Sequence, residues 1–201
     1  MSQVAISGNA SGTGVFTIAA PNSNSNYTLT LPAATGTLYI PGTTVSNIQS
    51  GTAVASTSGT SIDFTSIPSW VKRITVMFSA VSTSGTSDTI VRLGTGGSPE
   101  TSGYVGSVAR DSAGAGKLSS GILLSETTST TAATVFQGNL VICNLTSNTW
   151  SFNGDFGRSN TAALYTVAGY KSLAGVLNLV RVTTVNGTDT FDAGTINILY
   201  E

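Results

Sequence analysis

Residues 72–81 alternate apolar and polar side chains with a period of two, the pattern of a β-strand that packs on one side. Ile74, Val76, Phe78 and Ala80 fall on one face of such a strand. The opposite face carries the intervening residues, Arg73, Thr75, Met77 and Ser79. A strand with one apolar face needs a second layer to cover it, which favours a core between packed sheets.

Similar strand signals recur at short intervals after Ile62, separated by clusters of Gly, Ser, Asn and Asp. We expect further strands at residues 89–93, 104–109, 118–125, 134–143, 149–153, 164–168, 173–185 and 195–200. No segment keeps a helical period over three turns, and residues 159–164 allow at most a short helical turn. The sequence therefore predicts an all-β protein in which residues 61–201 form an antiparallel, jelly-roll-like β-sandwich.

Two local patterns lie near the C-terminal end of this domain. Asn186-Gly187 stands between β-branched runs and predicts a β-hairpin with a type I′ turn. In residues 173–185, Leu177 and Leu179 share one parity, whereas Val180 and Val182 share the other. Either a β-bulge re-aims this strand or both of its faces are buried, and the bulge is the commoner cause.

The first forty residues hold two short β-type runs, 15–18 and 27–31, each followed closely by a proline, Pro21 or Pro32. Strands this short cannot close a core of their own, and their apolar sides need cover from elsewhere. We expect copies of the same segment to supply it in a homotrimer, because each copy then provides edge partners for its neighbours. The candidate assembly residues are Phe16, Ile18, Leu29, Leu31 and Leu38. The predicted organisation is an extended N-terminal β segment (1–40), a linker (41–60) and the sandwich (61–201).

The charge content excludes several classes of partner. Only 8% of the 201 residues are charged, and the net charge is −1. Nucleic-acid binding needs several Lys or Arg on one face, and Lys72-Arg73 is the only adjacent basic pair. The N-terminus lacks the pattern of a signal peptide, and no apolar run approaches 18 residues. We therefore expect no nucleic-acid partner and no membrane insertion.

The residue types that carry most catalysis are scarce. The chain has no histidine, which removes Ser-His-Asp and Cys-His nucleophiles and most zinc sites. Its single cysteine, Cys143, lies in an apolar run and predicts a buried, inert thiol. Glycoside hydrolysis needs two carboxylates held close together, and most of the nine acidic residues lie in turn-like stretches. We expect a protein that is not an enzyme and that uses no cofactor and no metal.

Residues 146–160 are the best candidate for ligand contact, because they mix aromatics and amides with one acid and one base. The candidate glycan-contact residues are Trp150, Asn153, Asp155, Arg158 and Asn160. The competing interpretation, which we favour, is a hairpin with Trp150 and Phe152 in the core and residues 153–155 as its turn. Trp70 is expected to pack where the strand at 72–81 begins.

The N-terminal segment ASGTGVFTIAAPNSNSNYTLTLPAATGTL (10–38) resembles a short module of phage tail fibres and other virion fibre proteins. The module has a glycine-rich run, a TI-x-x-P step and a TLTLP-x-x-x-GTL step. The matching residues are Gly12, Gly14, Phe16, Thr17, Ile18, Pro21, Thr28, Leu29, Thr30, Leu31, Pro32, Gly36, Thr37 and Leu38. Residues 67–87 and 180–200 are similar, more loosely, to the terminal domains of such fibres.

This resemblance implies a place in a virion and carries no catalytic signature. One expected role is a homotrimeric tail fibre or receptor-binding protein that attaches to host-surface glycan. The alternative is a head fibre or cement protein that clamps the capsid through residues 1–40. Both imply other virion proteins as partners. A free lectin unrelated to viruses would explain the C-terminal domain but would leave residues 1–40 without a purpose.

Overall fold

The computed structural model describes residues 11–13, 22–26, 28, 48–111, 114–126 and 130–201. The chain divides into two units, Met1–Thr43 and Thr44–Glu201. The five candidate assembly residues all lie outside the described residues. They are Phe16, Ile18, Leu29, Leu31 and Leu38. The extended N-terminal segment and the trimer therefore remain predictions.

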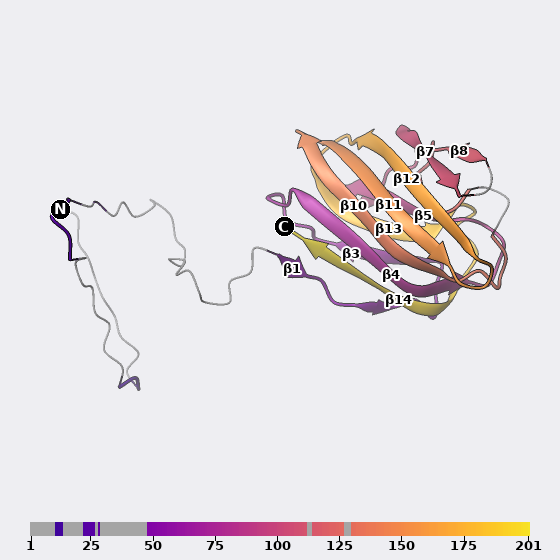
Figure 1. Ribbon diagram of the computed structural model, residues 1–201, viewed down its shortest axis with the longest axis horizontal. Coiled ribbons are helices and arrows are strands. Elements are labelled where there is room, and N and C mark those ends of the chain that lie inside the picture. The colour runs from indigo at the N-terminus through magenta and orange to yellow at the C-terminus, as the bar shows by residue number, and fades with distance from the viewer. Residues whose placement is uncertain (1–10, 14–21, 27, 29–47, 112–113, 127–129) are drawn as a thin grey trace. The chain divides into compact units, whose positions relative to one another are not determined.

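Every regular element among the described residues is a β-strand, and the strands form two antiparallel sheets, as predicted (Figure 1). Across the larger sheet the order is β1 (Gln49–Ser50), β14 (Phe191–Tyr200), β4 (Arg73–Thr83), β10 (Phe136–Thr146), β11 (Thr149–Arg158), β12 (Ala163–Ser172), β7 (Tyr104–Arg110) and β8 (Ala115–Lys117), with β2 (Val54–Ala55) also paired to β14. The smaller sheet runs β3 (Ser61–Thr65), β13 (Leu177–Thr184), β5 (Thr89–Thr95) and β6 (Ser98–Pro99), and β9 (Ile122–Leu123) pairs with β5.

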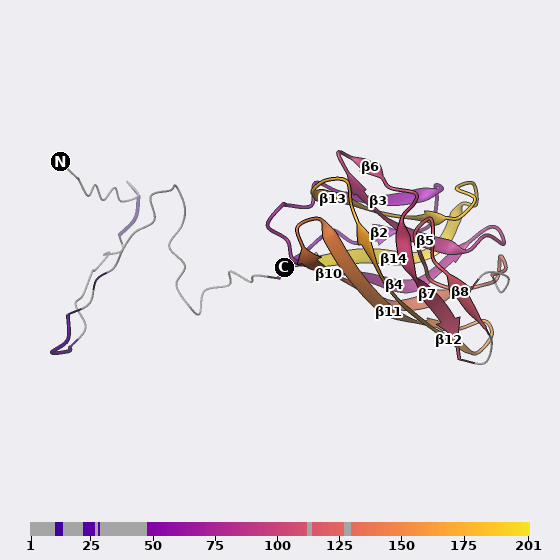
Figure 2. The ribbon, with the colours of Figure 1, turned by 90° about the horizontal axis from the view of Figure 1, so that it is seen from above.

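The chain crosses repeatedly between the sheets, as in a jelly roll, but β10, β11 and β12 follow one another as a meander in the larger sheet. Figure 2 shows the two layers, with β3 and β13 on one side and β10 and β11 on the other. The core fills the space between them with alternate side chains from both sheets. Phe78 and Phe156 meet there edge to face, with ring centroids 5.6 Å apart. The predicted linker, residues 41–60, contains two short strands, β1 and β2. Both pair with β14 and so belong to the larger sheet.

The alternation predicted along β4 holds as far as Phe78 and then breaks at Ala80. Ile74, Val76 and Phe78 are buried, but Ala80 is exposed, and Val81 takes the next core position. Ala80 has φ 52°, and the pairing of β4 with β10 shifts register at this point. The prediction that Ala80 faces the core is therefore wrong, because a β-bulge at this residue reverses the parity of the strand.

The irregular parity of β13 has both of the causes considered. Its pairing with β5 shifts register between Leu177 and Leu179, which confirms a bulge. Val180 and Val182 then face the core, while Leu179 on the opposite face is also fully buried. The bulge changes which face the side chains point to after Leu177. Leu179 is buried on the face opposite to Val180 and Val182, so both faces of β13 are buried at this point.

The segment at Asn186-Gly187 is not the predicted hairpin. β13 and β14 belong to different sheets, so residues 185–190 cross the edge of the sandwich. Gly187 has φ 70°, but Asn186 does not have positive φ, which excludes a type I′ turn. The Asn186 side chain instead accepts hydrogen bonds from the backbone N–H groups of Thr188 and Asp189, at 3.0 and 3.3 Å. An Asx-type turn of this kind suits a connection between layers.

Cys143 is half-buried rather than buried, because Leu140 and Ile142 take the core positions of β10 and leave the thiol on the outer face.

Candidate functional site

The five residues predicted to contact glycan do not come together. Trp150 faces the core and is 5% exposed, whereas Asn153 and Asp155 are exposed on the outer face of β11. Arg158 ends the strand, and its Nε donates a hydrogen bond of 2.9 Å to Oδ1 of Asn160. At a rise of about 3.3 Å per residue, Trp150 and Arg158 lie roughly 26 Å apart. Only Asn153 and Asp155 share one surface.

The favoured interpretation of this stretch is half correct. Trp150 and Phe152 are in the core, but residues 153–155 are not a turn, because β11 runs through them to Arg158. Gly154 keeps the strand alternation, packed against β10, where a Cβ would lie 2.6 Å from the backbone oxygen of Asn139. Phe156 resumes the core face at 1% exposure. The sequence pattern Asn-Gly-Asp is therefore a close approach of two strands and not a chain reversal.

A shallow groove of about 170 Å³ lies over β10 and β11 on the outer face of the larger sheet. We call it the outer groove. Its polar side chains are Asn139, Asn153 and Asp155, with Val141 beside them and glycine backbone as the floor. Strand register sets this arrangement, because Asn139 pairs with Asp155 and Val141 with Asn153. Residues opposite each other in antiparallel strands share a face at short range.

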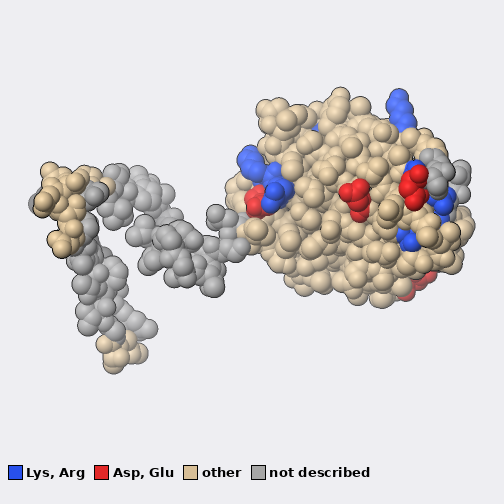
Figure 3. Space-filling view, in the orientation of Figure 1, with Lys and Arg blue, Asp and Glu red and all other residues tan. Residues whose placement is uncertain are grey.

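An apolar depression of about 250 Å³ adjoins the outer groove and shares Asp155 with it. Leu164 on its margin is 63% exposed, and Asp111 also borders it. Figure 3 shows this face of the domain, where charged side chains gather toward the two ends and an acidic side chain lies near the middle. Amides and a carboxylate beside apolar surface can bind hydroxyl groups and the C–H face of a sugar ring together.

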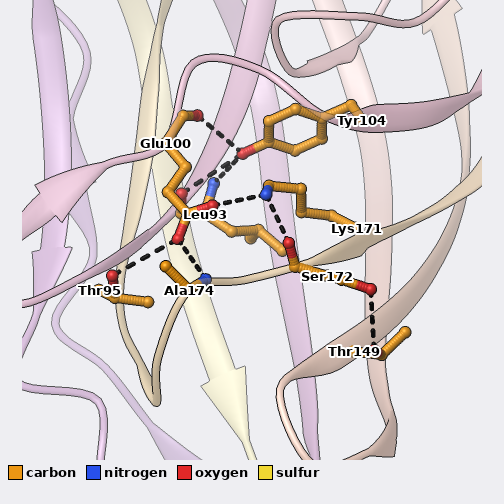
Figure 4. A network of polar contacts seen from close by, with 8 residues as sticks. All are labelled: Leu93, Thr95, Glu100, Tyr104, Thr149, Lys171, Ser172 and Ala174. Carbon is orange, nitrogen blue, oxygen red and sulfur yellow. Dashed lines mark hydrogen bonds and ion pairs between the residues drawn. The ribbon is translucent and has the colours of Figure 1, made fainter.

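Figure 4 shows a buried polar network whose residues are not among the predicted site residues. Lys171 on β12 forms an ion pair of 2.5 Å with Glu100, and their side chains are 6% and 21% exposed. Glu100 also accepts a hydrogen bond of 2.8 Å from the backbone N–H of Ala174. Burial acts to raise the pKa of Glu100, but the hydrogen bonds from Lys171 and Ala174 outweigh it and hold that pKa below its usual value.

Tyr104 completes this network at the same end of the sandwich. Its hydroxyl accepts a hydrogen bond of 2.7 Å from the Leu93 N–H and donates one of 3.2 Å to the Glu100 carbonyl. Burial raises the pKa of Tyr104 well above its usual value. Every group named here has a partner within the protein, so the network ties the two sheets together instead of presenting a reactive group. Lys171 lies on the same face of β12 as the buried residues Tyr165 and Val167, because all three have the same parity along the strand. This alternation was the signal in the sequence for its burial.

A second buried cluster surrounds Asp88, which is 8% exposed. Its carboxylate accepts hydrogen bonds from the hydroxyls of Ser125 and Thr130, at 3.0 and 2.5 Å. Burial raises the pKa of Asp88, although both hydroxyl hydrogen bonds act against that rise. The cluster joins the start of β5 to the segment before β10.

No group of three or more His, Cys, Asp and Glu side chains in the described ranges is placed to hold a metal ion. None of the described residues forms a helix that is long and apolar enough to cross a membrane. The chain matches no family model, no curated protein and no solved structure.

Proposed function

We propose that this chain is a non-enzymatic structural protein of a bacteriophage virion, a homotrimeric tail fibre or receptor-binding protein that attaches to host-surface glycan. In this proposal residues 1–40 dock to other virion proteins and the sandwich faces the host. The protein assembles in the host cytoplasm and is displayed on the virion. Three copies on one axis multiply a weak single-site affinity by avidity.

The observation that supports attachment is the outer groove. Asn139, Asn153 and Asp155 offer amide donors, amide acceptors and a carboxylate on one exposed surface. They stand on the paired strands β10 and β11, so the backbone ladder fixes their spacing before any ligand arrives. Preorganised polar groups lose little conformational freedom on binding. The resemblance of residues 10–38 to a fibre module supports the placement in a virion.

The test uses the purified full chain on an array of bacterial capsular polysaccharides and lipopolysaccharide O-chains. We expect binding to a small set of these glycans, and its loss in Asn153→Ala and Asp155→Ala. Ser107→Ala is the matched control, because Ser107 is exposed on the same face of the larger sheet but outside the groove. Equal binding by all three variants would reject the outer groove. New reducing ends in the bound polysaccharide would reject the non-enzymatic assignment.

The trimer is tested by light scattering of the full chain and of residues 48–201. We expect the full chain to give a mass near three times 20.3 kDa and the shortened chain to give a monomer. The shortened chain keeps β1 and β2, because both pair with β14. A trimer that survives the deletion would place the interface in the sandwich. A monomeric full chain would contradict self-assembly through residues 1–40.

Placement on the virion is tested with gold-labelled antibody against the chain. Label on the tail supports the receptor-binding role. Label spread over the head would replace it with the capsid-decoration role.

A further inference from the structure

The apolar depression adjoins the outer groove, and the two share Asp155. It holds about 250 Å³, and its surface is almost wholly hydrocarbon, with Ala109, Leu164 and Tyr165 among the residues that form it. An apolar cavity of roughly 150 Å³ can hold a benzene molecule, so the depression has room for a short apolar branch of a sugar. The Asp155 carboxylate therefore lies at the boundary between a polar surface and an apolar one.

Asp155 has a hydroxyl group beside it on the next strand. In the register of β11 and β12 it lies directly opposite Thr166, which also lines the depression. Both side chains are exposed, and neither has a side-chain hydrogen-bond partner among the described residues. Residues opposite each other in antiparallel strands have Cβ atoms about 4.5–5.5 Å apart. An ionised carboxylate only accepts hydrogen bonds and a hydroxyl can donate one, so the pair offers one acceptor and one donor at the edge of the depression.

An acetamido group matches this combination of groups. It carries an N–H donor, a carbonyl acceptor and a methyl group, and its N–H and C=O point in opposite directions because the amide is planar and trans. Its N–H can donate to Asp155 while its carbonyl accepts from the Thr166 hydroxyl, and its methyl group then contacts the hydrocarbon of the depression. A sugar hydroxyl at the same position would leave the depression unfilled. The methyl group of a 6-deoxy sugar would leave Thr166 without a carbonyl acceptor.

The charges around the depression favour a neutral ligand. Asp111 and Asp155 are exposed carboxylates on its lining. Arg110 is the one basic residue among the described residues that line it, and Arg110 forms an ion pair of 3.9 Å with Glu126. The described lining of the outer groove adds no basic residue. An acidic sugar would therefore meet two carboxylates of its own charge, whereas an N-acetylated neutral sugar avoids that repulsion.

The apolar contact at this site does not come from aromatic stacking. Tyr165 is the one aromatic residue among the described residues that line either pocket, and it is 2% exposed. Trp70, predicted to pack where β4 begins, lies beside the Tyr200 ring with centroids 6.0 Å apart. It is 48% exposed but lines neither pocket. An aliphatic branch, such as the methyl of an acetamido group, is the part of a sugar that suits the depression.

We propose that the outer groove and the apolar depression together bind one neutral N-acetylhexosamine unit of the host glycan. The acetamido methyl lies in the depression, its N–H donates to Asp155, and its carbonyl accepts from Thr166. The ring hydroxyls meet the amides of Asn139 and Asn153. The inference rests on the proposed function for its purpose, and it narrows the ligand from glycan in general to glycans with N-acetylated neutral sugars.

The experiment is saturation-transfer-difference NMR with the full chain. The probes are the methyl glycosides of N-acetylglucosamine and N-acetylgalactosamine, and the controls are methyl glucoside, methyl galactoside and methyl rhamnoside. We expect the acetyl methyl protons of at least one probe to receive more saturation than its ring protons. That probe should bind about tenfold or more tightly than the matched glycoside that has a hydroxyl in place of the acetamido group.

Two variants test the contacts separately. Thr166→Val should weaken binding of the N-acetylated probe roughly three- to tenfold, because it removes one hydrogen bond. Leu164→Ser should weaken it roughly fourfold, the effect of one buried methylene group, and should lower the saturation of the acetyl methyl. The matched controls Thr195→Val and Leu145→Ser change exposed residues of the same sheet outside both pockets and should leave the affinity unchanged.

Equal affinity for glycosides with and without the acetamido group would overturn the inference, and so would equal affinity in Leu164→Ser and Leu145→Ser. A stronger response to methyl rhamnoside would overturn the assignment of the acetamido group.

Asn153→Ala separates this inference from the proposed function, because Asn153 lines the outer groove and not the depression. Array binding that is lost in Asn153→Ala but unchanged in Leu164→Ser would reject the N-acetylhexosamine site and keep the attachment role. Absence of wild-type binding both on the array and in the NMR experiment would reject the two together.

Discussion

Replacing Lys171 by methionine would leave the Glu100 carboxylate without its main partner at the junction of the two sheets. The Lys171 side chain is 6% exposed and that of Glu100 is 21% exposed, so water can restore little of the lost contact. Methionine keeps most of the volume of the lysine chain. The change therefore removes charge and hydrogen bonds with little loss of packing.

Breaking one side of a buried ion pair costs about 3–5 kcal/mol. Glu100 retains the hydrogen bond from the Ala174 N–H and some contact with water, which lowers the expected loss to about 2–3 kcal/mol. For a domain of this size the loss corresponds to a fall in Tm of about 5–10 °C. The double variant Lys171→Met with Glu100→Gln removes both charges and should come within about 1 kcal/mol of wild type.

The assay is urea denaturation at pH 7 of wild type, both single variants and the double variant, with Lys117→Met as the exposed-lysine control. The pKa of Glu100 lies below its usual 4.5, so its stabilising contribution is present above that pH and is lost as the pH falls through the folded-state value. The gap between wild type and Lys171→Met should therefore narrow in acid. A loss below about 0.5 kcal/mol for Lys171→Met, within the range of ordinary surface changes, would refute the argument. A double variant no more stable than that single variant would refute it too.

Two further changes test other parts of the sandwich. Asp88→Asn should raise Tm at pH 7, because burial raises the pKa of Asp88 and its charged form opposes folding, while an amide oxygen can still accept from Ser125 and Thr130. Protonated Asp88 stabilises the wild type below the usual pKa of 3.8, and this stabilisation is lost as the pH rises. Calorimetry should therefore show that the gain in Tm of Asp88→Asn over wild type shrinks toward pH 3. A Tm below that of wild type at pH 7 would contradict the prediction. Gly154→Ala should destabilise by about 1–3 kcal/mol, because its Cβ would meet the Asn139 backbone oxygen at 2.6 Å. Gly114→Ala meets open space and serves as the control, so equal urea midpoints for the two variants would contradict the close approach.

The all-β class and the two-sheet sandwich could be predicted because alternation of side chains is a local property. Five residues are enough to predict one apolar face of β4, because apolar side chains alternate at Ile74, Val76 and Phe78. The bulge at Ala80 could not be predicted this way, since alanine fits either face and the positive φ depends on pairing with β10 and β14. Local chemistry suggested a hairpin at Asn186-Gly187, but whether two strands pair or separate is decided by contacts distant in sequence.

The candidate site was predictable only in part for the same reason. Asn153 and Asp155 were chosen from composition, and strand register brought Asn139 to them from β10. Trp150 was expected either at a ligand or in the core, and it lies in the core. No periodicity in a single sequence encodes the register that places Asn139 opposite Asp155.

The pairing of β1 with β14 has a consequence for how the sandwich can be connected to other structures. Gln49 lies opposite Tyr200, and antiparallel partners have Cα atoms about 4.5–5.5 Å apart. The first and last strands of the sandwich are therefore neighbours, and its two chain ends lie close together. A polypeptide fused after Glu201 would therefore start next to residue 48, where the chain enters the sandwich. The turn at residues 159–162 is not part of either connection.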